Sequence, residues 1–78
     1  MSFSSRQRNT IDVDVGGTFT DMVMVFNGEQ IYRKVPTTPY DLSVSFMQVI
    51  EEGARHFGLS IEQLLPEIDM IRYSTTVA

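Results

Sequence analysis

A strict alternation of apolar and polar residues over positions 10–15 constrains this chain more than any other feature. The apolar and acidic members fall on opposite faces of an extended segment: Ile11, Val13 and Val15 on one, Asp12 and Asp14 on the other. This is the period-two pattern of a strand with one buried face. At Gly16-Gly17 the pattern breaks, and we expect a turn with unusual backbone angles there.

Two further extended segments predict a three-stranded antiparallel meander. Residues 18–26 form the second strand, and because both of its faces are apolar we expect both to be covered. Asn27-Gly28 follows, the strongest short hairpin signal, because a type I′ turn needs positive φ at both central residues. Residues 29–35 form the third strand. Pro36 and Pro39 then end the meander, because proline lacks the donor that a central strand needs.

The second half of the chain predicts two helices and a final strand. Asp41 is a suitable N-cap for a helix to about Phe57, and Ser60 with Gln63 forms a capping box for a short helix through Leu65. Residues 70–73 form the last strand, which we expect to join the sheet in parallel after the helical crossover. Residues 74–76 begin a polar turn. The order β-β-β-α-α-β defines an α/β fold.

Composition narrows the possible functions and the location of the chain. The 78 residues hold ten acidic and six basic side chains, and the scattered Lys and Arg exclude the clustered basic face of a nucleic-acid-binding protein. No apolar run approaches the roughly 20 residues that span a bilayer, so no membrane partner is expected. The absence of cysteine fits the cytoplasm. We expect residues 1–9 to be a flexible N-terminus and residues 10–78 to be the N-terminal portion of a domain truncated at 78.

The hairpin at Gly16-Gly17 has the chemistry of a phosphate site. Consecutive glycines let an anion approach the backbone and point several amides at it. The hydroxyls of Thr18 and Thr20 add donors, and Asp14, just before the turn, is placed to hold Mg²⁺ through water. Neither the P-loop nor the dinucleotide-binding glycine pattern is present, since these glycines open a strand rather than a helix.

The plain alternative is an ordinary tight hairpin with glycines at its tip, because short motifs often match by chance. Several polar groups around one turn exceed what a hairpin needs, and this favours the phosphate site. Asp12 is interpreted as an exposed strand carboxylate without a role, and Asp14 as the functional one of the two.

Three segments in order resemble the N-terminal region of the hydantoinase A / 5-oxoprolinase family, which includes acetone and acetophenone carboxylase subunits. The first is Asp12 to Asp21, the second is Lys34-Val35-Pro36-Thr37-Thr38-Pro39, and the third is Ser74-Thr75-Thr76-Val77-Ala78. The resemblance spans about residues 10–78. It implies part of an actin-like (ribonuclease H-like) ATPase lobe that uses ATP and Mg²⁺.

The resemblance also implies roles for particular residues. The cofactor-binding residues would be the following: Asp14, Gly16, Gly17, Thr18, Phe19, Thr20 and Asp21. Among them Asp14 would be the magnesium-side carboxylate, and Asp21 would support the loop or the metal. Thr75 and Thr76 would lie on the substrate side of the cleft. The catalytic residues are expected downstream of Ala78, so the chain alone is expected to be inactive.

Family members use ATP to activate a carbonyl or amide oxygen, either for hydrolysis of a cyclic amide or for carboxylation of a ketone. The resemblance therefore implies a small carbonyl substrate and, as partner, the remainder of the same polypeptide or a companion subunit in a hetero-oligomer. The residues Arg72-Tyr73-Ser74 favour the ketone-carboxylase branch. Two alternatives stay open: a sugar kinase of the same superfamily, and a non-catalytic interaction module that uses exposed strand edges.

Overall fold

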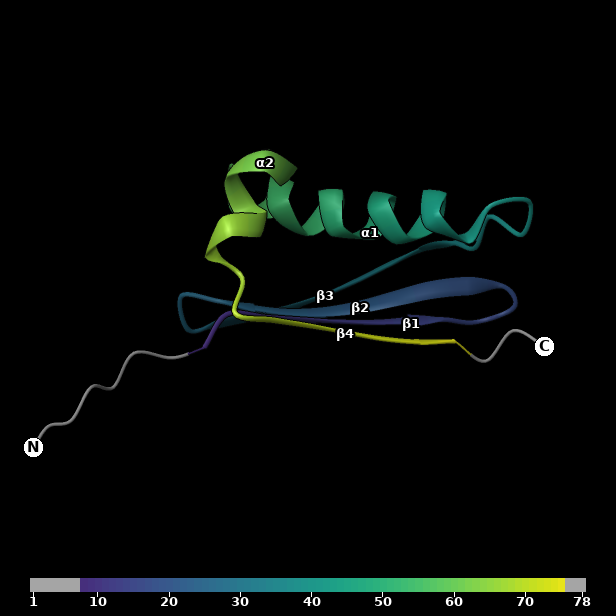
Figure 1. Ribbon diagram of the computed structural model, residues 1–78, viewed down its shortest axis with the longest axis horizontal. Helices are drawn as coiled ribbons and strands as arrows, with labels where there is room; N and C mark the ends of the chain where they lie inside the picture. The colour runs from purple at the N-terminus through teal and green to yellow at the C-terminus, as the bar shows by residue number, and fades with distance from the viewer. Residues whose placement is uncertain (1–7, 76–78) are drawn as a thin grey trace, which may run out of the picture.

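The computed structural model describes residues 8–75 of the chain. Four strands and two helices with a short 3₁₀ turn follow one another in the expected order (Figure 1). Their bounds are Thr10–Val15 (β1), Phe19–Phe26 (β2), Glu29–Pro36 (β3), Leu42–His56 (α1), Ile61–Leu64 (α2), Leu65–Glu67 (η1) and Met70–Thr75 (β4).

The strands form one sheet in the order β3-β2-β1-β4. The first three are antiparallel neighbours, and β4 pairs with β1 in parallel after the helical crossover, as predicted. Both helices lie on the same side of this sheet, and the opposite side carries no helix within residues 8–75 (Figure 1). We call that opposite side the open face.

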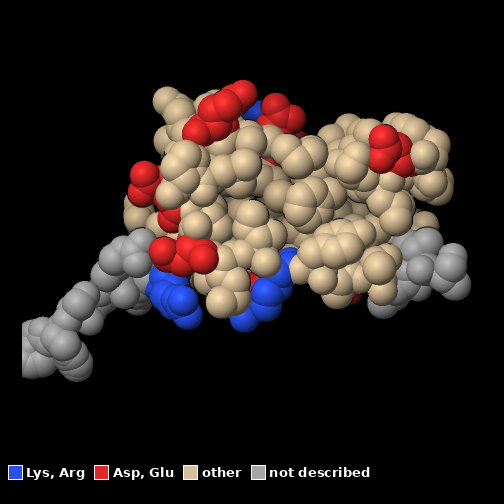
Figure 2. Space-filling view, viewed as in Figure 1, with Lys and Arg blue, Asp and Glu red and all other residues tan. Residues whose placement is uncertain are grey.

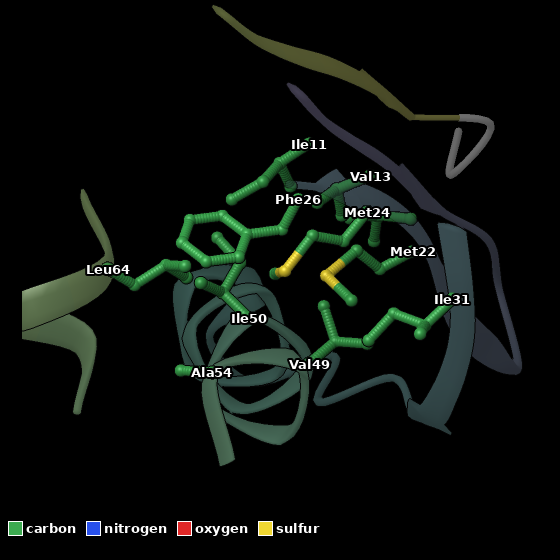
Figure 3. Packing of buried hydrophobic residues seen from close by; sticks show 11 residues of the cluster. Ile11, Val13, Met22, Met24, Phe26, Ile31, Val49, Ile50, Ala54 and Leu64 are labelled. Carbon is green, nitrogen blue, oxygen red and sulfur yellow. The ribbon is translucent and has the colours of Figure 1, made fainter. Parts of the chain in front are cut away.

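The core lies between the sheet and α1, because alternate residues of the strands point toward the helix. From β1 these are Ile11, Val13 and Val15, and from β2 they are Thr20, Met22, Met24 and Phe26. The methionine side chains reach from β2 toward α1, where Val49 and Ile50 meet them (Figure 3). The alternation that predicted β1 therefore reflects burial of one of its faces.

The far face of β2 departs from the expectation that both of its faces are covered. Val23 and Val25 point to the open face and are half-buried there. Their cross-strand neighbours on β3 are Tyr32 and Gln30, whose side chains cover only part of the apolar surface. Within residues 8–75 no helix lies over this face, so β2 is covered on one side.

The helix ends follow the residues that predicted them. The Asp41 side chain accepts a hydrogen bond from the backbone N–H of Ser43 and caps α1. At the other end Gly58 has φ of +74°. Its amide donates to Arg55 and the next amide to Ala54, so the helix closes in a Schellman arrangement. Both hydrogen bonds of the predicted capping box are present in α2.

Three local expectations need correction. Ser74 and Thr75 belong to β4 rather than to a turn, because the ladder with β1 continues to the pair Val15 and Thr75. Pro36 is the last residue of β3, which tolerates it as an edge strand of this sheet. Asn9 lies within the folded part: its side chain accepts from the Asn27 amide at 2.9 Å and donates to the Glu67 carbonyl at 2.9 Å.

Buried hydroxyls tie the β1–β2 turn to α1. Thr20 Oγ1 lies 3.0 Å from Thr37 Oγ1 and 3.2 Å from Ser45 Oγ. The Thr37 hydroxyl donates to the Gly16 carbonyl at 2.8 Å, and the Ser45 hydroxyl donates to the Leu42 carbonyl at 3.3 Å. The turn, the β3–α1 connection and the start of α1 are thus joined at one end of the sheet (Figure 1).

At Gly53 the backbone of α1 packs tightly against two methionine side chains of β2. A Cβ placed there would lie 2.5 Å from Met24 Cε and 2.8 Å from Met22 Cε. We expect Gly53→Ala to change the free energy of unfolding by less than about 1 kcal/mol, because the flexible methionine tips can move and alanine favours the helix. Gly53→Val should destabilise by about 1–3 kcal/mol through overpacking. Thermal unfolding measures both, and equal effects of the two would contradict this packing.

The hydroxyl network predicts a local effect of Thr20→Val, which keeps the shape of the side chain and removes its hydrogen bonds. The loss of about 1 kcal/mol should speed amide exchange roughly fivefold in peptides that span residues 16–20 and 37–45. Hydrogen–deuterium exchange of the complete protein measures this change. Thr18→Val, at an exposed position in the same turn, is the matched control. Identical exchange in both variants would show that the hydroxyl network does not hold the turn against α1.

Candidate functional site

The open face of the sheet carries a hollow of about 500 Å³ over β1, β2 and β4. Its lining residues are Asp12, Val13, Asp14, Asp21, Met22, Val23, Arg72, Tyr73 and Ser74. The acidic residues of β1 come to this face because the apolar residues between them are buried on the other. The same alternation in β2 brings Asp21 to it.

Asp12 is neutralised by an ion pair. The Arg72 guanidinium on β4 donates from Nε to Asp12 Oδ1 and from Nη2 to Asp12 Oδ2, the second at 3.2 Å. The two residues are direct partners in the parallel ladder. The hydrogen bond from Arg72 lowers the pKa of the Asp12 carboxyl and raises that of the guanidinium. Asp12 therefore has a structural partner that its strand position did not indicate.

Asp14 and Asp21 stand directly opposite each other in the β1–β2 ladder. Directly opposed like charges destabilise a pair of strands. Within residues 8–75 neither carboxylate forms an ion pair. The hairpin thus brings two uncompensated negative charges together beside its turn.

Each of these carboxylates accepts a hydrogen bond from a hydroxyl on an outer strand. Ser74 on β4 donates to Asp14 Oδ1 at 3.2 Å, and Tyr32 on β3 donates to Asp21 Oδ1 at 2.7 Å. Lys34 is the direct ladder partner of Asp21, yet its ammonium lies 4.7 Å from the centre of the Phe19 ring. The nearest cation along the ladder is thus engaged with an aromatic face.

The Gly16-Gly17 turn lacks the unusual backbone angles expected from the sequence. Positive φ among the described glycines occurs at Gly28 and Gly58, and neither Gly16 nor Gly17 has it. A Cβ on Gly17 would meet nothing within 4 Å. The Gly16 amide donates to the Phe19 carbonyl at 3.0 Å, which closes the turn. The described fold therefore gives no reason for a glycine at position 17.

The threonines of the sequence prediction fall in different places. Thr18 is exposed at the turn, whereas Thr20 is fully buried on the helix side and does not line the open face. Thr75 ends β4 beside Val15, and Thr76 lies outside the described residues. Phe19 is exposed on the open face at the start of β2. The structure therefore gathers Asp14 and Asp21 at the hollow and places Gly17, Thr18 and Phe19 at the adjoining turn.

Sequence reasoning gave no role to the partners Arg72, Tyr32 and Ser74. The register of the β2–β3 hairpin could have found Tyr32, because it fixes which residues share a face. Arg72 and Ser74 depend on the register of the parallel β1–β4 pair, which no turn in the sequence sets. The view in Figure 2 shows its Lys and Arg side chains at separate places rather than as one basic patch. Among residues 8–75 no helix is long and apolar enough to cross a membrane.

Comparison with known proteins agrees with the resemblance seen in the sequence. The family described as the hydantoinase/oxoprolinase N-terminal region matches residues 10–78. The gamma subunit of acetophenone carboxylase from Aromatoleum aromaticum is 60% identical over 70 residues, which cover 90% of this chain and 10% of that subunit. The alpha subunit of caprolactamase from Pseudomonas jessenii is 29% identical over 75 residues, which cover 95% of this chain and 11% of that subunit.

A solved nucleotide-free structure of acetone carboxylase, described with the mechanism of ATP-dependent acetone carboxylation, has the same fold. The TM-score is 0.78 at 28% identity, covering 91% of this chain and 10% of that one. The α/β fold expected from the sequence, part of an actin-like ATPase lobe, is thereby confirmed. The chain spans about a tenth of the length of the curated relatives it matches. By the match over residues 10–78, the chain belongs to the hydantoinase/oxoprolinase N-terminal region family.

Proposed function

We propose that this chain is the N-terminal phosphate-binding segment of an ATP-dependent enzyme that activates a carbonyl oxygen. Its companion would be the remainder of the same polypeptide or a further subunit, which supplies the catalytic residues beyond Ala78. The observation that carries the proposal is the opposed pair Asp14 and Asp21 beside a glycine turn, for which residues 8–75 supply no ion-pair partner. A bound cation would relieve the repulsion that the hairpin register creates.

The residues present fit Mg²⁺ and a nucleotide phosphate. Magnesium in phosphate sites is usually held by one or two carboxylates together with phosphate oxygens and water. Asp14 and Asp21 would provide such carboxylates, with Asp14 acting through water. Gly17 has open space where a side chain would stand, so a phosphate can approach the turn closely. When bound, ATP supplies the phosphoryl group and Mg²⁺ offsets its charge.

The other residues predicted from the sequence have different roles in the proposed site. Thr18 would contribute turn donors, and Gly16 would hold the turn closed through the hydrogen bond from its amide to the Phe19 carbonyl. Phe19 would shield the turn, with the Lys34 ammonium over its ring. Thr20 would act by holding the turn against α1 through its buried hydroxyl bonds. Thr75, at the end of β4, would face the substrate side, and the same role is proposed for Thr76, which lies outside the described residues. The enzyme would act in the cytoplasm, as the absence of cysteine suggests.

The proposed substrate is a ketone that is carboxylated with bicarbonate, with hydrolysis of a cyclic amide as second candidate. The 60% identity to an acetophenone carboxylase subunit favours the ketone. The 29% identity to a caprolactamase subunit is the reason that a lactam is the second candidate substrate. In hydrolysis of a cyclic amide, phosphorylation would convert the amide oxygen to a better leaving group. A ketone keeps its oxygen in the carboxylated product, so there phosphorylation would hold the enol form as a phosphate ester ahead of carboxylation. The chain's contribution would be to position the phosphates and to stabilise their charge.

The proposal is tested by substrate-dependent ATP hydrolysis of the complete protein. An aryl ketone with bicarbonate should stimulate hydrolysis, and omission of bicarbonate should abolish product formation. Stimulation by a lactam without bicarbonate would favour the hydrolase. Phosphorylation of a hexose would instead identify a sugar kinase, and indifference to every carbonyl compound would overturn the proposal.

Gly17→Ala should separate folding from nucleotide binding. Because the added methyl meets nothing in the described fold, the melting temperature should stay within about 2 °C of the wild type. If a phosphate lies against this glycine, ATP affinity measured by calorimetry should fall about tenfold or more. Unchanged ATP affinity would place the phosphates elsewhere.

Asp14→Asn and Asp21→Asn should change stability and activity in opposite directions. Removal of one of two opposed charges should stabilise the metal-free protein by about 0.2–1 kcal/mol. The same substitution should lower Mg²⁺-dependent ATP hydrolysis by about a hundredfold, since the charge acts on the phosphate site. Asp12→Asn is the matched control, because Asp12 is already paired with Arg72. Loss of activity in the control alone would contradict the assignment.

A further inference from the structure

Tyr32 lies outside every residue assigned to the phosphate site, yet its hydroxyl meets one of the site's carboxylates. It stands on β3 opposite Val23, and Asp21 is the diagonal neighbour on the same face. Diagonal neighbours across strands are within reach of aromatic side chains. The hydroxyl donates to Asp21 Oδ1 at 2.7 Å, the length typical of a hydrogen bond to an ionised carboxylate.

A carboxylate in this position needs an external constraint. The terminal torsion of an aspartate side chain is broad, so the side chain itself sets the orientation of the carboxylate only weakly. Repulsion from Asp14 directly opposite would turn the two groups apart. Lys34, the cation across the ladder, is held over the Phe19 ring. Within residues 8–75 Tyr32 is the one side chain that donates a hydrogen bond to Asp21.

The Tyr32 hydroxyl contacts one of the two oxygens of the Asp21 carboxylate. The bond occupies Oδ1, and Oδ2 accepts no hydrogen bond from residues 8–75. Asp14 is held in the same manner but more loosely, by the Ser74 hydroxyl at 3.2 Å.

We propose that Tyr32 is a positioning residue that fixes the Asp21 carboxylate against its repulsion from Asp14, so that both carboxylates face one divalent cation. This inference rests on the proposed function of the hairpin. Tyr32 touches neither metal nor phosphate and acts through Asp21. Ser74 performs the weaker equivalent task for Asp14. The outer strands β3 and β4 thus orient the functional carboxylates of the central strands β1 and β2.

The test is calorimetric binding of the non-hydrolysable ATP analogue AMP-PNP to the complete protein over a series of MgCl₂ concentrations. In Tyr32→Phe the Mg²⁺ concentration for half-maximal binding should rise about tenfold, the range found for partners of metal ligands. Nucleotide affinity at saturating Mg²⁺ should stay within about twofold, because the phosphate donors are intact. The Mg²⁺ dependence of ATP hydrolysis should shift by the same factor, with kcat unchanged at saturation.

Tyr40→Phe is the matched control, because Tyr40 is an exposed tyrosine outside the site. It should leave both curves unchanged. A Tyr32→Phe protein with the wild-type Mg²⁺ curve would overturn the inference while leaving the proposed function intact. A wild-type protein that binds no AMP-PNP at any Mg²⁺ concentration would overturn the proposed function, and the role of Tyr32 with it. An equal loss of affinity at all Mg²⁺ concentrations would indicate a structural role only and would also overturn the inference.

Discussion

The register of the β1–β2 hairpin determines which side chains of these two strands are buried and which lie on the open face. Burial of Ile11, Val13 and Val15 against α1 forces the acidic residues of β1 to the open face. Because a one-residue slip would bury those carboxylates, the register is strongly specified. That register places Asp14 opposite Asp21. The opposed carboxylates are therefore a consequence of the packing that stabilises the sheet.

The rest of the chain supports this arrangement from both sides. On the helix side, the buried hydroxyl of Thr20 joins the turn to α1 through Thr37 and Ser45. On the open face, β3 and β4 contribute hydroxyls that meet the two carboxylates. Arg72 neutralises Asp12, whereas the two carboxylates nearer the turn have no ion-pair partner in the described part of the chain. The β1–β2 hairpin is thus held to α1 by buried hydrogen bonds. Its two carboxylates accept hydrogen bonds from the outer strands, and its glycine turn is open to solvent.

The fold was largely predictable because its signals are local. The alternation of apolar and acidic residues predicted β1, and the capping residues predicted the starts of both helices. The Asn27-Gly28 dipeptide predicted the second hairpin, and both of its residues have the positive φ that such a turn needs. The sequence predicted β4 only as far as Tyr73, because all of its side chains are exposed and show no burial pattern. Its last two residues are identified as strand only by their pairing with β1. Turn geometry at Gly16-Gly17 was also missed, since two glycines permit positive φ without requiring it.

The candidate site was predictable in its carboxylates but not in their partners. The motif around the glycines indicated Asp14, and the family resemblance added Asp21. Tyr32 and Arg72 come from strands far along the chain, and only the pairing between strands shows that they reach this face. Thr20 was grouped with the phosphate residues by proximity in sequence, whereas its strand position turns it into the core.

The most direct test of the central claim is an experimental structure of the complete protein with Mg²⁺ and AMP-PNP bound. The account predicts phosphate oxygens beside Gly16-Gly17 and one metal ion facing both Asp14 and Asp21. Phosphates bound away from this turn, with the two carboxylates still facing solvent, would contradict it.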